Sequence, residues 1–268
     1  MSIVDKYDAR AQAINSLVCV GLDTDVANLP PAFQFHETPQ FAYNQFIIEQ
    51  THAYAAAYKP NIAFYEARGE QGLRELHMTI AYLQENHPDI FTICDAKRGD
   101  NHVTNQGYVT GIFDLMGFDA ITLHPYLGQE ALAPFLSRAD KGCIILCRTS
   151  NAGAAELQDV SVSISGDPLW LHVARMVAHN WNANSNCMLV AGATYPDDLR
   201  RMRAAVGDMT LLVPGVGAQG GDVAETVQAG RNAAGRGLII SSSRAILWAD
   251  DPAEAARDLR DEINAARV

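Results

Sequence analysis

The sequence predicts a single α/β domain, a (β/α)8 TIM barrel that extends over residues 1–268. Three observations support this fold class. Eight short apolar runs alternate with eight amphipathic segments, as parallel strands alternate with their crossover helices. Most of the runs are continuously apolar, which is typical of strands covered on both faces. No G-x-G-x-x-G motif follows the first run, which disfavours an open doubly wound sheet.

The eight apolar runs have the lengths of buried strands, whereas helices in globular proteins are longer. We predict strands at 17–23, 55–59, 90–97, 120–125, 142–149, 187–193, 210–216 and 237–243.

Amphipathic patterns of helical period fill the intervals. We predict helices at 39–54, 71–86, 103–116, 129–139, 168–181, 195–206, 222–234 and 251–267. The last begins with Asp251 and Pro252, because proline favours the first helical position. A Gly- and Ser-containing stretch at about 150–168 predicts a loop insertion after the fifth strand that is too short to be a domain.

The acidic composition restricts the partners of this protein. The formal net charge is −11 and the pI is near 5.1. Such a surface repels nucleic acid and anionic membranes, so we expect neither as a partner. A phosphate ligand must be bound by a local group of donors.

The cysteines predict a reducing compartment. Their number is odd and none forms a C-x-x-C pair, which suits neither a disulfide framework nor zinc. We expect small buried thiols at Cys19, Cys94, Cys143, Cys147 and Cys187. The segment MSIVDKYDARAQ contains no apolar signal core, and no apolar run approaches ~18 residues. The expected location is the cytoplasm.

Charged side chains lie at the C-terminal ends of the predicted strands, where the active sites of such barrels lie. Lys59 ends the second strand, and Asp95 and Lys97 end the third. Because Asp95 and Lys97 are two residues apart, a regular strand would point both to the same side. Burial of single ions is unfavourable, so we expect a network of alternating charge. A structural salt bridge that caps the barrel is the alternative.

Two loops at the same end predict a phosphate site. PGVGAQGGD at 214–222 follows the seventh strand, and SSSRAI at 241–246 follows the eighth. Loops after these strands form the usual phosphate site of the fold. Free backbone N–H groups and the Arg244 guanidinium suit a phosphate dianion. A plain tight turn with a surface arginine is the alternative.

Six motifs in register carry a family resemblance, although each alone is weakly specific. They are GLD (21–23), YKPNIAFYE (58–66), DAKRGD (95–100) with Thr104, RTSN (148–151), PGVGAQGGD and SSSR. Together they resemble the orotidine 5′-phosphate decarboxylases. KRGD and KPNIAFYE are most similar to the longer bacterial branch. The resemblance extends from about Val20 to Arg244.

The resemblance implies a homodimeric enzyme that converts orotidine 5′-monophosphate to uridylate and CO2 in de novo pyrimidine biosynthesis, without metal or cofactor. Lys59, Asp95 and Lys97 would form a catalytic charge array with the partner subunit's Asp100. Asp95 would disfavour the substrate carboxylate, and Lys97 would stabilise and then protonate the carbanion at C6. Thr104 would accompany Asp100 across the interface.

The resemblance also implies the substrate-binding residues. Asp23 would bind ribose hydroxyls and Ser150 the pyrimidine edge, while the phosphate would be held by Gln219 and Arg244, with Gly220 and Ser243 beside them. Three residues depart from the common pattern of the family, and they affect interface packing and the fifth loop, not the charge array. They are Asn101, Ala152 and Ser243.

Two other functions remain as alternatives. A sugar-phosphate decarboxylase or aldolase of the same barrel type would use Mg²⁺, held in part by an acidic residue at the end of the second strand. Lys59 stands there and would repel the metal. A catalytically inactive nucleotide-binding barrel is the second alternative, although such a scaffold has no need for buried charges.

We expect structural roles for two histidines, the tryptophans and three arginines. His102 and His124 lack H-x-H or H-E-x-x-H spacing, so we expect hydrogen-bonded side chains and not metal ligands. We expect the tryptophans to pack in the interior. We expect the arginines of the 195–206 helix to form a solvated face; they are Arg200, Arg201 and Arg203.

Overall fold

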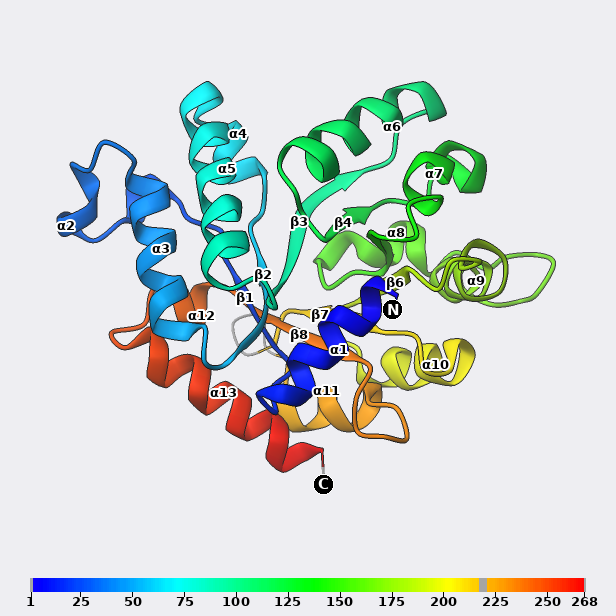
Figure 1. The fold of residues 1–268 in the computed structure, drawn as a ribbon. Coiled ribbons are helices and arrows are strands. Elements are labelled where there is room, and N and C mark those ends of the chain that lie inside the picture. The colour runs from blue at the N-terminus through cyan, green and yellow to red at the C-terminus, as the bar shows by residue number, and fades with distance from the viewer. Residues whose placement is uncertain (1, 217–220, 268) are drawn as a thin grey trace.

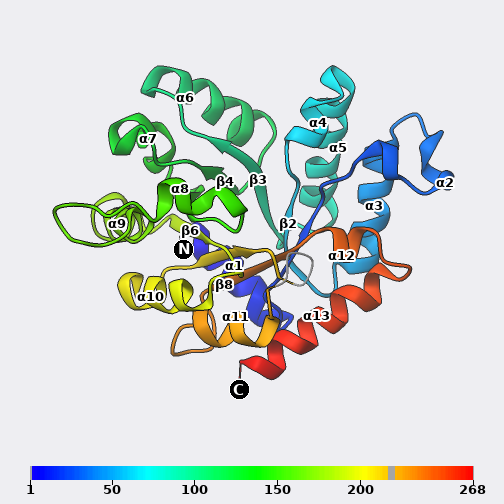
Figure 2. The ribbon, with the colours of Figure 1, turned by 180° about the vertical axis from the view of Figure 1, so that it is seen from behind.

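The computed structural model describes residues 2–216 and 221–267 and contains a closed barrel of eight parallel strands (Figures 1 and 2). Each strand pairs with its neighbour in the sequence, and β8 closes the barrel on β1. The strands are β1 Val18–Gly21, β2 Ala55–Lys59, β3 Phe91–Arg98, β4 Ala120–Leu123, β5 Gly142–Arg148, β6 Cys187–Ala191, β7 Leu211–Pro214 and β8 Leu238–Ser242. The predicted fold class and all eight predicted strands are confirmed.

The eight predicted helices are present and surround the barrel (Figure 1). They are α3 Pro39–Thr51, α5 Gly69–Asn86, α6 His102–Val109, α7 Gly128–Leu136, α9 Leu169–Met176, α10 Pro196–Val206, α11 Val223–Gly230 and α13 Pro252–Ala266. π-Helical turns at Thr110–Leu115 and Val177–Trp181 complete the predicted lengths of α6 and α9. Asp251 caps α13 as expected, since its side chain accepts a hydrogen bond from the Glu254 amide.

Helix α1, Ile3–Ala13, was not predicted. Its signal is present in the sequence, because Ser2 and Asp5 form a reciprocal capping box. The helix covers the N-terminal end of the barrel, where the Tyr7 hydroxyl donates to the Leu238 carbonyl at 2.6 Å. In Figure 1 it crosses in front of the strands. It closes the end of the barrel opposite the site described below.

Four shorter helices lie in the loops. They are α2 Pro31–Gln34, α4 Ala63–Glu66, α8 Ala155–Gln158 and α12 Arg244–Leu247. Helix α8 and a 3₁₀ turn at Ala152–Ala154 lie in the segment predicted as a loop after the fifth strand. In α8 the Gln158 side chain donates to the Thr149 hydroxyl at 2.7 Å, which folds this segment back onto the end of β5.

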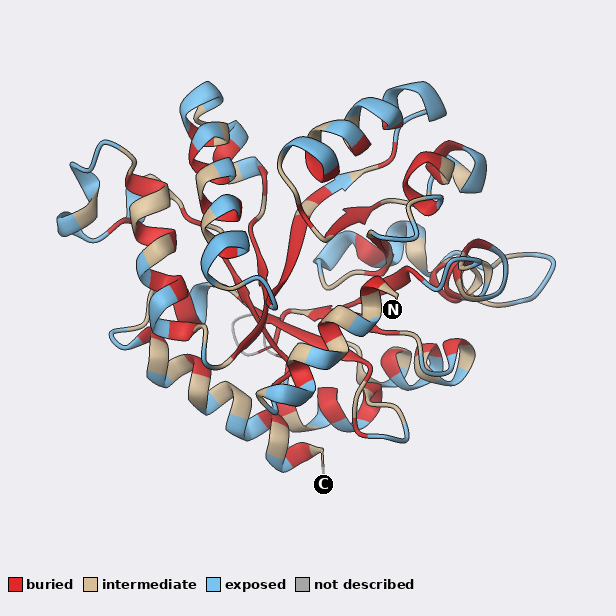
Figure 3. Cartoon of the chain, in the orientation of Figure 1, coloured by how far each residue is buried: buried red, intermediate tan, exposed pale blue. Residues whose placement is uncertain are grey.

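The strands form the core, and the helices bury their inner faces against it (Figure 3). All five cysteines are buried free thiols, as expected. Trp170 and Trp181 are buried as well. Across the described residues, no helix is long and apolar enough to cross a membrane.

The expected solvated arginine face of α10 was wrong for Arg203. Its guanidinium donates to the carbonyls of Gly230 at 2.7 Å and Gly237 at 2.8 Å. These bonds join α10 to the end of α11 and the start of β8. A long arginine side chain can bury its stem and still satisfy its donors on backbone carbonyls, so helical position alone did not reveal this role.

Candidate active site

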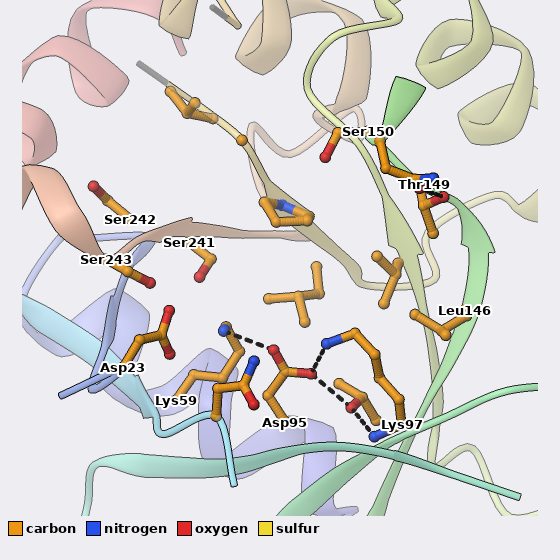
Figure 4. Close-up of a pocket in the computed structure, with 18 of the residues that line it drawn as sticks. Asp23, Lys59, Asp95, Lys97, Leu146, Thr149, Ser150, Ser241, Ser242 and Ser243 are labelled. Carbon is orange, nitrogen blue, oxygen red and sulfur yellow. Dashed lines mark hydrogen bonds and ion pairs between the residues drawn. The ribbon is translucent and has the colours of Figure 1, made fainter. Parts of the chain in front are cut away.

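A cavity of about 490 Å³ opens at the C-terminal ends of the strands (Figure 4). Its walls combine apolar side chains from β5, β6 and β7 with a ring of polar side chains. The polar residues are Asp23, Lys59, Asn61, Asp95, Lys97, Thr122, Thr149, Ser150, Asn151, Ser241, Ser242, Ser243 and Arg244. The cavity therefore lies where the sequence predicted the functional site.

Asp95 is the centre of a charge network in this cavity. Its Oδ2 lies 3.2 Å from Lys59 Nζ, and its Oδ1 lies 2.6 Å from Lys97 Nζ. Figure 4 shows the two ammonium groups on opposite sides of the carboxylate. The side chains of Lys59 and Asp95 are 6% and 11% exposed, whereas that of Lys97 is 49% exposed. Lys97 is thus the member of the network that a ligand in the cavity reaches most easily.

The network favours the charged forms of its buried members. Burial raises the pKa of the Asp95 carboxyl, but the charges of Lys59 and Lys97 act in the opposite sense and hold it well below its usual value. Burial lowers the pKa of Lys59, but Asp95 and Asp23 outweigh it and raise that pKa above its usual value. Asp95 is therefore a carboxylate and Lys59 an ammonium at neutral pH.

The third strand brings Asp95 and Lys97 together by a different geometry from the one predicted. A regular strand would project both side chains to one side, but the register against β4 shifts between Cys94 and Arg98. Lys97 has φ +47°, in the left-handed region that side-chain-bearing residues rarely adopt. The end of β3 is therefore a bulge. Asp95 and Lys97 are in contact and line the same cavity, as predicted, but a bulge and not a regular strand brings them together.

Asp23 and Ser150 both line the cavity, as predicted. Asp23 Oδ1 is buried and accepts no hydrogen bond from a described residue, so it is available to a ligand hydroxyl. Ser150 packs against Gly192, where an added Cβ would lie 2.9 Å from the Ser150 amide nitrogen. The glycine at the end of β6 therefore lets the Ser150 segment approach the barrel closely.

The rim formed after β8 contains two of the predicted phosphate residues. Ser243 and Arg244 line the cavity, and Arg244 is exposed to solvent. Gln219 and Gly220 lie outside the described residues. Pro214, at the end of β7, lies on the cavity wall near the same rim.

Asp100 and Thr104 do not line this cavity. Both are exposed, and Asp100 lines a separate surface pocket with Lys97, Tyr108, His124 and other residues. Lys97 therefore borders both pockets. This arrangement agrees with the expectation that Asp100 need not reach the site of its own barrel.

Three residues that the sequence singled out form hydrogen bonds outside the cavity. Asn101, one of the family departures, caps α6, because its Oδ1 accepts a hydrogen bond from the Thr104 amide at 3.1 Å. His124 Nδ1 accepts from the Tyr126 amide at 3.4 Å. His102 Nδ1 lies 3.4 Å from the Glu130 carbonyl oxygen. Both histidines are hydrogen-bonded, as expected.

Asn61 and Thr122 are among the polar residues of the cavity that were not named as site residues from the sequence. Asn61 lies two residues after Lys59, and Thr122 lies in β4 in contact with Asp95. The proximity of Asn61 to Lys59 in the sequence was a usable signal. Thr122 gave no such signal, because a threonine within an apolar run is expected of any strand.

A family model described as "Orotidine 5′-phosphate decarboxylase / HUMPS family" matches residues 16–259. The chain belongs to this family. An orotidine 5′-phosphate decarboxylase of Cellvibrio japonicus is 48% identical over the full length of both proteins, and one of Azoarcus is 46% identical, also over both full lengths. The solved structure of Leishmania donovani OMP decarboxylase covers 100% of this chain with a TM-score of 0.89 and 39% identity, and 99% of that chain is covered. The cavity of this family member thus lies in a barrel shared with the named decarboxylases.

Proposed function

We propose that this protein converts orotidine 5′-monophosphate to uridylate and CO2, the decarboxylation step of pyrimidine biosynthesis. The observation that carries the proposal is the Lys59–Asp95–Lys97 network at the mouth of a barrel that is 48% identical to a named orotidine 5′-phosphate decarboxylase. A carboxylate between two ammonium groups suits a reaction in which a substrate carboxylate leaves and negative charge develops beside it.

In the proposed reaction, the C6 carboxylate of the substrate lies beside Asp95, whose negative charge disfavours it. The C–CO2 bond then breaks and its electron pair stays on C6. The ammonium of Lys97 stabilises this carbanion and donates a proton to it, which gives uridylate. Lys59 acts through Asp95, because its charge keeps that carboxylate ionised in a buried position.

The remaining cavity residues suit the rest of the nucleotide. Asp23 would accept hydrogen bonds from ribose hydroxyls through its buried Oδ1. Ser150 would bind the pyrimidine edge. Arg244, with Gln219, would hold the phosphate. Since the phosphate lies far from C6, its binding energy can be used to orient the reacting carbon.

We propose catalysis without a metal. The Mg²⁺-dependent alternative requires an acidic residue at the end of β2, but Lys59 lies there, 3.2 Å from Asp95. A divalent cation at this position would meet a fixed positive charge. The inactive-barrel alternative is disfavoured, because an accessible ammonium next to a buried carboxylate is an arrangement suited to reaction.

We propose a homodimer in which the partner subunit's Asp100 completes each site. Asp100 lies outside its own cavity, and Lys97 borders both the cavity and the Asp100 pocket. Exposed apolar side chains surround this face, with Val103 79%, Tyr126 81% and Leu127 47% exposed. Contact with a second copy would cover them. The acidic net charge disfavours nucleic-acid partners. The buried free cysteines suit a reducing compartment such as the cytoplasm.

Turnover of orotidylate, with and without chelator, tests the proposed activity. Protein dialysed against EDTA should convert orotidylate to equal amounts of uridylate and CO2 at the undialysed rate. A rate that falls on dialysis and returns with Mg²⁺ would support the sugar-phosphate alternative. Binding of uridylate without any turnover would support the inactive barrel.

A further inference from the structure

We propose that Thr122 is a positioning residue of this active site, whose hydroxyl group holds the Asp95 carboxylate and the Lys97 backbone in their reactive arrangement. The proposal rests on the decarboxylase function proposed above. Thr122 is 1% exposed on β4 and directly adjoins the bulge at the end of β3.

The register of the two strands places Thr122 opposite the whole bulge. Between Cys94 and Arg98 of β3 lie three residues, whereas their β4 partners are separated by Thr122 alone. The bulged segment 95–97 therefore lacks a regular ladder of backbone hydrogen bonds to β4. The side chain of Thr122 replaces part of that ladder.

The hydroxyl group of Thr122 has one partner on each side. Its Oγ1 accepts a hydrogen bond from the Lys97 amide at 3.0 Å and donates one to Asp95 Oδ1 at 2.9 Å. A hydroxyl has a single proton, so acceptance from the amide leaves that proton for the carboxylate. Lys97 Nζ bonds to the same Oδ1 at 2.6 Å, which closes a ring of three residues. Figure 4 shows the contact between Asp95 and Lys97 as a dashed line.

The backbone of Lys97 needs such support. Its φ of +47° lies in a region that is unfavourable for a residue with a side chain. Conformations of this kind persist where the surroundings hold them. The hydrogen bond from the Lys97 amide to Thr122 fixes the backbone, while the bond from Thr122 to Asp95 fixes the carboxylate that Lys97 contacts. Loss of the hydroxyl would release both groups together.

The Thr122→Val variant keeps the shape of the side chain and removes both hydrogen bonds. We expect kcat for orotidylate to fall about 10- to 100-fold, since two groups that act in the chemical step lose their orientation. Uridylate affinity should change less than about 3-fold, because phosphate and ribose bind elsewhere in the cavity. Thr122→Ser retains the hydroxyl and should keep kcat within about 3-fold of the parent protein.

Thr92→Val is the matched control. Thr92 is a buried β3 threonine whose hydroxyl also joins a carboxylate and an amide, because it bonds Asp119 Oδ2 and the Asp119 amide at 3.0 Å each. It lies at the opposite end of the barrel. Thr92→Val should lose stability and keep kcat. If Thr122→Val does not fold, Thr122→Cys replaces it, since a thiol is a weak donor, and the same fall in kcat is expected.

The outcomes separate the two proposals. If a folded Thr122→Val or Thr122→Cys variant keeps the kcat of the parent protein, the proposed role of Thr122 is overturned, but the proposed function is not. A Thr122→Ser variant that is as slow as Thr122→Val overturns that role as well, because the methyl group would then be the important part. An equal loss of kcat in Thr92→Val would show a general effect of destabilisation and overturn it too. Absence of orotidylate turnover in the parent protein, measured in the same assay, overturns the proposed function and this inference with it.

Discussion

At the scale of single residues, the site depends on backbone positions as well as on charged groups. Gly21 at the end of β1 is an example, since an added Cβ would lie 1.8 Å from Ser243 Oγ and 2.7 Å from Ser243 Cβ. Ser243 directly precedes Arg244 at the rim of the cavity. A side chain at Gly21 would therefore displace the residue that begins the proposed phosphate site.

Gly21→Ala should raise KM for orotidylate about tenfold with a smaller change in kcat, because it disturbs binding at the rim more than the charge network. Gly142→Ala is the control, since its added Cβ would also be crowded, 2.7 Å from Met188 Cε, but at the other end of the barrel. It should lower the melting temperature and leave KM unchanged. Steady-state kinetics of both variants check this, and an equal KM rise in both would count against a phosphate site at Ser243 and Arg244.

The charged residues of the site were predictable, whereas their geometry was not. Lys59, Asp95 and Lys97 stand out because charges at the ends of buried strands are unfavourable unless they are paired. The bulge at Lys97 depends on the register between β3 and β4, which is set by contacts between segments distant in sequence. The role of Thr122 depends on that bulge and so could not be seen in the sequence.

At the scale of elements, the C-terminal ends of α3 and α5 meet in a pair of histidines. The rings of His52 and His87 lie 4.6 Å apart, and His87 Nε2 lies 3.2 Å from Glu49 Oε1. Burial lowers the pKa of His52, and the charges of His87 and Arg10 add to this effect, although Glu49 and Asp89 oppose it. His52 is therefore harder to protonate in the folded protein than in the unfolded chain.

This depressed pKa makes stability depend on pH. In the unfolded chain the pKa of His52 is near 6.5. Above that pH, His52 is neutral in both the folded and the unfolded state, so it does not lower the free energy of unfolding. As the pH falls below that value, the unfolded chain binds the proton first, so the free energy of unfolding decreases until the folded pKa is passed. His52→Gln should lose less stability than the parent protein between about pH 7 and pH 5.

Urea unfolding at a series of pH values measures this difference. His77→Gln is the control, because His77 is exposed on α5. It should show the same pH dependence as the parent protein. Parallel curves for the parent protein and His52→Gln would contradict the assignment of this pH dependence to His52.

Most elements followed from the periodicity of apolar residues, and the exceptions have physical reasons. Helix α1 was missed although its capping box was visible at Ser2 and Asp5. The short helix α8 lies in a polar stretch without apolar period, and its contacts with the end of β5 are made by side chains such as Gln158. Local propensity is too weak to reveal helices of one turn.

At the scale of the whole molecule, the proposed active site requires two chains. On the face around Asp100, exposed apolar side chains adjoin a proposed catalytic residue. A two-fold interface would make the two sites equivalent, with each composed of residues from both chains. This arrangement can be tested with pairs of inactive variants.

Lys97→Ala and Asp100→Ala should each be nearly inactive alone, and a mixture that is unfolded and refolded together should regain activity. Random pairing makes about half of the dimers mixed, and each mixed dimer has one intact site, so about a quarter of the parent activity should return. If Asp100 served its own barrel, no pairing would create an intact site. If mass spectrometry detects mixed dimers in the refolded mixture and the mixture is still inactive, the shared site is disproved.

In the proposed mechanism, the charge network performs the decarboxylation while the rim binds the nucleotide. The most direct measurement compares kcat for orotidylate with the dissociation constant for uridylate in Lys97→Ala, with Arg244→Ala as its counterpart. Lys97→Ala should lower kcat by on the order of a thousandfold or more with little loss of uridylate affinity, because it removes the proton donor. Arg244→Ala should mainly raise KM. Near-normal turnover in Lys97→Ala would show that Lys97 is not the proton donor.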